Sequence, residues 1–237
     1  MSVSYGQYCP VAKAMDLLDE RWTMLIIREL MLGSTHFNTM RRGVPRMSPA
    51  LLSKRLTTLI RAGVVERHED GTRVSYRLSQ AGRELAPIIE LIGQWGTRWV
   101  PELGDEDLDP HLLMWDMHRR IDLDAVPDGR TTLLFSFADV ATSDRDWWLV
   151  IGRDGVDVCD FDPGYDVRAT IRTTLRTMIE VWRGDLGWGH ALRSGELAVD
   201  GDETARRALP RWLMLSVFAT VPRPDRGQRL PESSVPA

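Results

Sequence analysis

A run of short polar and basic side chains between residues 48 and 61 has the spacing of one helix face and could hydrogen-bond to nucleic acid. Its members occupy positions i, i+3, i+4, i+7 and i+11: Ala50, Ser53, Lys54, Thr57 and Arg61. A lysine can donate to guanine acceptors, a serine can pair with several bases, and a small alanine can approach a thymine methyl group. The side chains expected to meet base edges are those nearest the helix start: Ser48, Ala50, Ser53 and Lys54.

Four arginines around this segment supply the charge that phosphate binding requires. They lie before the segment and in the hairpin expected after it: Arg41, Arg42, Arg46 and Arg73. The first three are expected to contact phosphates, and Arg73 to reach a minor groove or the backbone. All but two of the 30 basic residues are arginines. That bias suits such contacts, and genome composition explains it equally well.

Local signals predict the elements that hold these side chains. Ser48 can cap a helix whose first residue is Pro49, and Gly63 can end that helix in the left-handed conformation. The inner face of the helix is apolar: Leu52, Leu56 and Leu59. Two alternating segments, 64–69 and 72–78, are joined by Asp70-Gly71 and predict a hairpin with one buried and one basic face.

Helical patterns surround this unit on both sides. Two cover residues 10–33 with a break at 19–21, a short helix is expected over 36–42, and Ser79 begins another helix with an apolar stripe reaching Val100. Helices followed by a capped helix and a hairpin are the order of a winged helix-turn-helix, whose second helix enters the major groove.

The same residues resemble the HxlR family of bacterial transcription regulators over about residues 8–100. The specific pieces are Cys9-Pro10, Arg21-Trp22, "SPALLSKRLTTL" and "LSQAGREL". This resemblance implies a winged-helix homodimer that binds paired half-sites in double-stranded DNA. It also implies that the terminal helices, near 8–18 and 79–100, form the dimer interface.

Charge divides the chain of 237 residues into two halves. Residues 1–103 hold 14 basic and 10 acidic residues, whereas residues 104–237 hold 16 and 24. A basic half joined to an acidic half indicates two tasks. We expect a DNA-binding and dimerisation domain at 1–103, an acidic linker at 104–110, a second domain at 111–222 and a disordered tail at 223–237.

The second half predicts an α+β domain, so the whole chain is expected to be α+β. Strands are expected over 131–138, 147–151, 156–161, 168–172 and 197–199, and helices over 174–182 and 203–212. The segments "WWLVIGRDGVDVCDF", "WRG" and "SGELAVDGD" resemble the sterol carrier protein-2-like (SCP2-like) domain. That resemblance implies a curved sheet and helices around an apolar tunnel.

Aromatic and methionine side chains of this half are candidate walls of an apolar ligand pocket, and they could equally form a filled core. They are Met114, Phe135, Phe137, Trp148, Met178, Trp182, Trp188 and Trp212. The domain therefore either senses an apolar small molecule or has an architectural role.

Cys9 matches a cysteine with which some relatives in the HxlR family sense oxidants. Sensing needs an accessible thiol with a lowered pKa, to which a helix start and Lys13 could contribute. The alternative, which we favour, is a small residue at the dimer seam.

Residues 111–222 contain no metal-ligand cluster, phosphate loop or nucleophile elbow, and we expect no catalytic residues, no metal and no cofactor in the chain. The sequence also lacks a signal segment and a long apolar run, which predicts a cytoplasmic protein without a membrane partner. The rival from another class is a lipid-binding or carrier protein whose winged helix binds protein.

Overall fold

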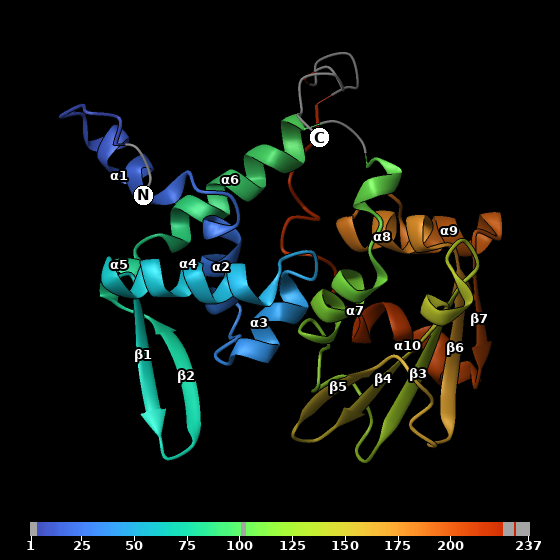
Figure 1. Cartoon of the computed structure of the whole chain (residues 1–237). Coiled ribbons are helices and arrows are strands. Elements are labelled where there is room, and N and C mark those ends of the chain that lie inside the picture. The colour runs from blue at the N-terminus through green and yellow to red at the C-terminus, as the bar shows by residue number, and fades with distance from the viewer. Residues whose placement is uncertain (1–3, 101–102, 225–229, 231–237) are drawn as a thin grey trace. The chain divides into compact units, whose positions relative to one another are not determined.

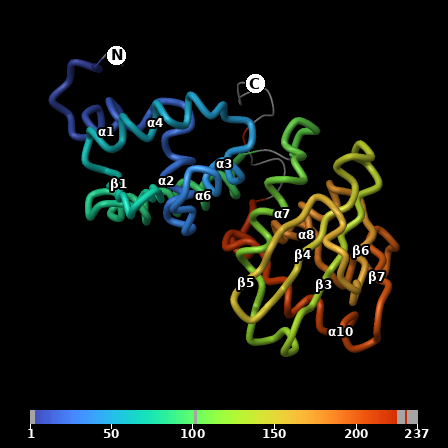
Figure 2. Tube along the Cα trace, turned by 60° about the horizontal axis from the view of Figure 1, so that its bottom comes forward, coloured from blue at the N-terminus to red at the C-terminus, as the bar shows by residue number. Residues whose placement is uncertain are grey.

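The computed structural model describes residues 4–100, 103–224 and 230. The chain divides into two compact units, Met1–Trp95 and Gly96–Ala237. Helices and two sheets occur along it, which confirms the α+β class. Figures 1 and 2 show the order of these elements along the chain.

The first unit consists of helices and one hairpin. Its elements are α1 (Pro10–Leu18), α2 (Thr23–Met31), α3 (Phe37–Gly43), α4 (Pro49–Arg61), β1 (Val65–Asp70), β2 (Arg73–Leu78), α5 (Gln80–Arg83) and the start of α6 (Ala86–Trp99). The core joins buried side chains of α2, α3 and α4, among them Ile26, Met40 and Leu56. In Figure 1 the two strands extend from this helical body as a projecting hairpin.

Two expectations for this unit need correction. The helix after Ser79 is two helices, because Pro87 lacks the N–H that a continuous helix would use and disfavours helical backbone before it. The hairpin has no fully buried face: only Val65 and Leu78, at its base, are buried, whereas Val74 and Tyr76 are half-buried. The strands project beyond the core, so alternation alone did not bury them.

The second unit is a five-stranded sheet with helices on one face. Its elements are η1 (Asp105–Asp107), α7 (Pro110–His118), β3 (Thr131–Phe137), η2 (Thr142–Asp144), β4 (Asp146–Gly152), β5 (Gly155–Cys159), β6 (Val167–Thr173), α8 (Leu175–Arg183), α9 (Trp188–Ser194), β7 (Leu197–Gly201) and α10 (Glu203–Trp212). The strand order is β5-β4-β3-β6-β7, and β3 pairs with β6 in parallel. Buried side chains of α7, α8, α9 and α10 form one core with a single face of the sheet.

Alternation decides which strand residues enter that core. Phe135 and Phe137 of β3 and Trp147 of β4 point into it, whereas Trp148 lies on the opposite face of the sheet, paired with Leu134. Helices α7 and α9 were not expected from the sequence. Helix α7 has only a weak amphipathic pattern, because its apolar residues lie on most sides, and five of its nine residues are buried.

The segments expected as linker and tail contain fixed residues. Asp105 of the expected linker pairs with Arg176 at 2.6 Å, and Arg176 also donates to the carbonyl oxygen of Leu103, just before that segment, at 3.0 Å. At the other end, Arg223 donates to the Arg183 carbonyl oxygen at 3.0 Å and pairs with Asp185 at 2.9 Å. Most of the predicted tail, 225–229 and 231–237, lies outside the described residues.

Within the part of the chain that the structure describes, none of the helices has the length and apolar character needed to cross a membrane. The described residues also contain no group of three or more His, Cys, Asp or Glu side chains that could hold a metal ion.

Candidate nucleic-acid interface

Helix α4 has a capped start, a buried apolar face and an exposed polar face. The Ser48 hydroxyl accepts the N–H of Leu51 at 3.3 Å, and Pro49 occupies the first turn, as the sequence predicts. Leu52, Leu56 and Leu59 are buried on the inner face. Gly63 follows the helix at φ 72°, in the left-handed region that glycine enters without strain.

The outer side of this helix and its surroundings are open to solvent. The ten predicted DNA-contacting side chains are all exposed: Arg41, Arg42, Arg46, Ser48, Ala50, Ser53, Lys54, Thr57, Arg61 and Arg73. Nine of them lie in the segment that runs from α3 to the end of α4, and Arg73 lies on the hairpin. The Thr57 hydroxyl donates back to the Ser53 carbonyl oxygen at 2.9 Å, so its oxygen is presented as an acceptor.

A buried glutamate helps to hold together α2 and α3, the two helices that precede α4, and it was not predicted from the sequence. Glu29 of α2 is completely buried and pairs with Arg28 at 3.0 Å. Its other carboxylate oxygen accepts from the Ser34 hydroxyl at 3.0 Å, and Arg28 also donates to the Gly43 carbonyl oxygen at 2.9 Å. These bonds join α2 to the end of α3. The available signal was a glutamate among apolar residues on the inward face of α2.

The hairpin is anchored at its base. The N–H of Tyr76 donates to the Thr35 carbonyl oxygen at 2.7 Å, and the Ser79 hydroxyl donates to the Gly63 carbonyl oxygen at 2.6 Å. The hairpin thereby joins the loop between α2 and α3 and the end of α4. It is a wing whose position relative to α4 is fixed by these hydrogen bonds.

The wing face expected to be basic has mixed charge. The strand register places Arg73 opposite Asp70 and Arg77 opposite Glu66, on the same face. Cross-strand neighbours of opposite charge attract one another and lower the local positive potential. The prediction of a purely basic face is wrong, because it rested on β2 alone and left out the acidic side chains of β1.

Cys9 precedes the first residue of α1 and is half-buried. The backbone N–H groups of Ala12 and Val11, at the start of the helix, lower the pKa of the Cys9 thiol. Lys13 is not among the groups that lower this pKa, and its ammonium group pairs with Asp16 at 3.5 Å. The expected contribution of Lys13 to the thiol is therefore wrong.

The predicted pocket walls of the second unit lie mainly in a packed core. Six of the eight are buried there: Met114, Phe135, Phe137, Met178, Trp182 and Trp212. Trp188 packs against this core, and Trp148 lies on the other face of the sheet. Trp148 and Phe135 therefore cannot share one pocket wall.

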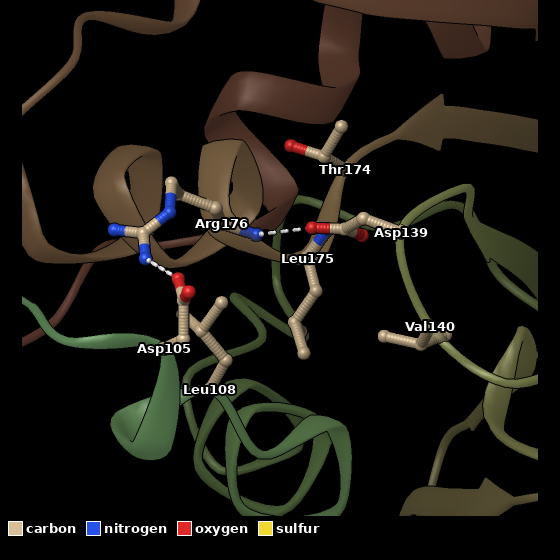
Figure 3. A pocket seen from close by; sticks show the side chains of 7 residues that line it. All are labelled: Asp105, Leu108, Asp139, Val140, Thr174, Leu175 and Arg176. Atoms are coloured by element: carbon tan, nitrogen blue, oxygen red, sulfur yellow. Dashed lines mark hydrogen bonds and ion pairs between the residues drawn. The ribbon is translucent and has the colours of Figure 1, made fainter.

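A pocket of about 540 Å³ lies elsewhere in this unit, at the start of α8 (Figure 3). Its lining mixes charged and polar side chains with aliphatic ones: Asp105, Leu108, Asp139, Val140, Thr174, Leu175 and Arg176. Asp139 accepts the N–H of Leu175 at 2.5 Å and already occupies the helix start. None of the eight predicted wall residues lines it.

Comparison with known proteins matches the first part of the chain. Residues 17–103 match the HxlR-like helix-turn-helix family. An HTH-type transcriptional regulator of Bacillus subtilis, YvaP, is 37% identical over 102 residues, which cover 41% of this chain and 94% of that protein. A second HTH-type regulator, Mb3122 of Mycobacterium bovis, is 40% identical over 96 residues, and this chain spans 59% of its length. The structure of the reduced transcriptional regulator YodB from Bacillus subtilis is 31% identical, covering 42% of this chain and all of that one, with a TM-score of 0.36.

Proposed function

Because the chain belongs to the HxlR-like helix-turn-helix family, we propose that it is a transcriptional regulator that binds an inverted-repeat operator in double-stranded DNA as a homodimer. The observation that carries this proposal is α4, with its capped start, its buried leucines and its exposed polar face. Residues at the start of such a helix meet base edges, and the arginines before it meet phosphates.

Two exposed apolar faces support the homodimer. On α6, Ile88, Leu91, Ile92 and Trp95 follow helical spacing and are 46–63% exposed, and no residue of this helix is buried. On α1, Val11 is 66% exposed and Met15 is 39% exposed. Apolar side chains gathered on one face of each helix are typical of a surface covered by a partner. We assign both faces to a second copy of the chain.

Selection of bound duplexes from a random pool tests the proposal. A two-fold dimer should select an inverted repeat whose half-site centres lie about one helical turn, roughly 10 bp, or a multiple apart. Selected sites without dyad symmetry would contradict the dimeric arrangement. Failure to select any duplex, together with capture of a protein partner, would favour the carrier alternative.

For the second unit we propose an SCP2-like domain, with the boundaries 111–222 after the linker 104–110. A five-stranded sheet with its helices on one face agrees with this assignment. The burial of six candidate wall residues in one packed core favours the architectural role over an apolar sensor. Thermal melts with fatty acids, sterols and aromatic compounds test the choice, because a ligand at a hundredfold excess over its Kd adds about 2.7 kcal/mol.

For Cys9 we propose a place at the dimer seam, as part of the α1 face. The alternative is oxidant sensing, and the lowered pKa of the thiol favours that reading. Peroxide treatment separates the two roles. A sensor loses operator affinity on treatment, and Cys9→Ser abolishes the response. A seam residue shows no response to peroxide, and its replacement weakens the dimer.

A further inference from the structure

One arginine of α4 is turned away from the exposed polar face. The guanidinium of Arg55 pairs with the carboxylate of Glu20, in the corner between α1 and α2. The two side chains are only 15% and 27% exposed, respectively. Its neighbour Lys54 is exposed, because successive helical residues point in different directions. Arg55 thus belongs to α4, the proposed reading helix, but its charge is paired with a carboxylate of the same protein.

The corner that receives Arg55 has a fixed and strained backbone. Trp22 has φ 80°, and among the described residues it is the only non-glycine residue with a positive φ. A bulky residue in this conformation persists only where its surroundings hold it there. The guanidinium of Arg21 lies 5.6 Å from the Trp22 ring centroid, and the Asp19 carboxylate accepts the Tyr5 hydroxyl at 2.5 Å. The backbone that carries Glu20 is therefore held in one conformation.

We propose that Arg55 is a positioning residue for DNA binding: its ion pair with Glu20 latches α4 onto the α1–α2 corner. This inference rests on the proposed function of α4. The latch fixes the rotation of α4 about its own axis, and so decides where Ser53 and Lys54 point. It also connects the reading helix to α1, to which we assign a dimer contact, so that a displacement of α1 reaches α4.

The opposing possibility is that Arg55 contacts a phosphate, as basic residues of DNA-binding helices often do. The two roles predict opposite signs for Glu20→Gln. If Arg55 binds phosphate, this substitution removes an anion and releases a cation, so affinity for the operator rises. If Arg55 is a latch, the same substitution loosens α4 and lowers affinity by about tenfold.

Salt dependence gives a second distinction. Loss of a phosphate contact flattens the plot of log affinity against log salt concentration by about one, because one fewer counterion is released. Under the latch, Arg55→Gln lowers affinity and leaves that slope unchanged. The exchanged pair, Glu20→Arg with Arg55→Glu, restores a large part of the affinity. A phosphate contact would not be restored, since a glutamate would then face the DNA.

The experiment measures operator binding by the full-length wild type, Glu20→Gln, Arg55→Gln and the exchanged pair at several salt concentrations. Glu84→Gln is the matched control, because it removes the same charge from an exposed position on the same unit. Tighter binding by Glu20→Gln, or a slope lowered by Arg55→Gln, would overturn the latch. Lower affinity at an unchanged slope, with recovery in the exchanged pair, is the expected result.

Hydrogen exchange keeps this test separate from the test of DNA binding. Under the latch, Glu20→Gln raises amide exchange in residues 19–23 and in α4, whereas Glu84→Gln does not. If the wild type selects no duplex, the proposed function fails, and exchange still decides whether the pair holds α4. Unchanged exchange in both segments would overturn the latch whatever the protein binds.

Discussion

The carboxylate of Glu29 fills the space beside the Cα of Gly43 in which any other residue would place its Cβ. A Cβ built on Gly43 would lie 1.9 Å from the carboxyl carbon of Glu29, far inside van der Waals contact. Gly43 is the last residue of α3. The Glu29 carboxylate forms an ion pair with the Arg28 side chain and accepts a hydrogen bond from the Ser34 hydroxyl. The glycine is needed here for close approach, and this contact sets the packing of α3 on α2.

Gly43→Ala should destabilise the protein by about 2 kcal/mol, because the buried carboxylate cannot move without losing its bonds. Chemical denaturation measures this change. Gly187→Ala is the control, since a Cβ there meets open space. The loss should shrink when Gly43→Ala is made in a Glu29→Ala background, which removes the obstructing group. An undiminished loss would assign the effect to backbone conformation.

Lys54→Ala and Arg42→Ala should weaken operator binding in different ways. Lys54→Ala should cost about 1–3 kcal/mol and relax sequence preference at one position, because we assign it to a base edge. Arg42→Ala should weaken binding to all duplexes alike and flatten the salt slope by about one. Binding to the operator and to single-base variants, measured over a salt series, separates the two. Identical behaviour of the two variants would refute the assigned roles.

Leu91→Asp should raise the dissociation constant of the dimer by at least about tenfold, because it places a charge on the exposed apolar face of α6. Sedimentation equilibrium measures this constant. Leu192→Asp is the control: Leu192 is 40% exposed on α9, a helix that is not assigned to dimerisation. Equal effects of the two substitutions would argue that α6 has no special part in the dimer.

The Cys9 thiol should react with iodoacetamide faster at neutral pH than a cysteine in unfolded chain. Its pKa is lowered in the fold, so the thiolate fraction at pH 7 is higher. The reaction rate should rise with pH through a midpoint below that of the same thiol in urea. The Cys9→Ser variant keeps only Cys159, so its reaction rate gives the contribution of Cys159, which is subtracted from the rate of the wild type. Coincident midpoints in folded and unfolded protein would show that the start of α1 does not act on the thiol.

Local signals explain how much of the first unit could be predicted. The cap at Ser48, the glycine at 63 and the Asp70-Gly71 turn each act within a few residues, and each lies where the sequence places it. The contact of Glu29 with Gly43 and the opposed charges of the wing depend instead on packing and register between segments. No periodicity within one segment contains that information.

The sheet of the second unit shows the same limit at a single position. The alternation along β4 places Trp147 and Trp148 on opposite faces of the sheet. It does not indicate which of the two faces meets the helices. With two tryptophans side by side, either choice gives an aromatic core. The register with β3 decides it, since Trp147 lies opposite the buried Phe135. Helix α9 was missed because its seven residues are too few for a clear amphipathic pattern.

The opposed charges on the wing have a consequence for the speed of association. Beyond a Debye length, about 8 Å at physiological ionic strength, Asp70 and Glu66 cancel much of the field of Arg73 and Arg77. An approaching duplex is therefore attracted first by exposed basic side chains of α3 and α4, such as Arg41 and Lys54, rather than by the wing. Under the proposed function, long-range attraction orients α4 toward the major groove before the wing makes contact, so the wing should influence the lifetime of the complex more than its rate of formation.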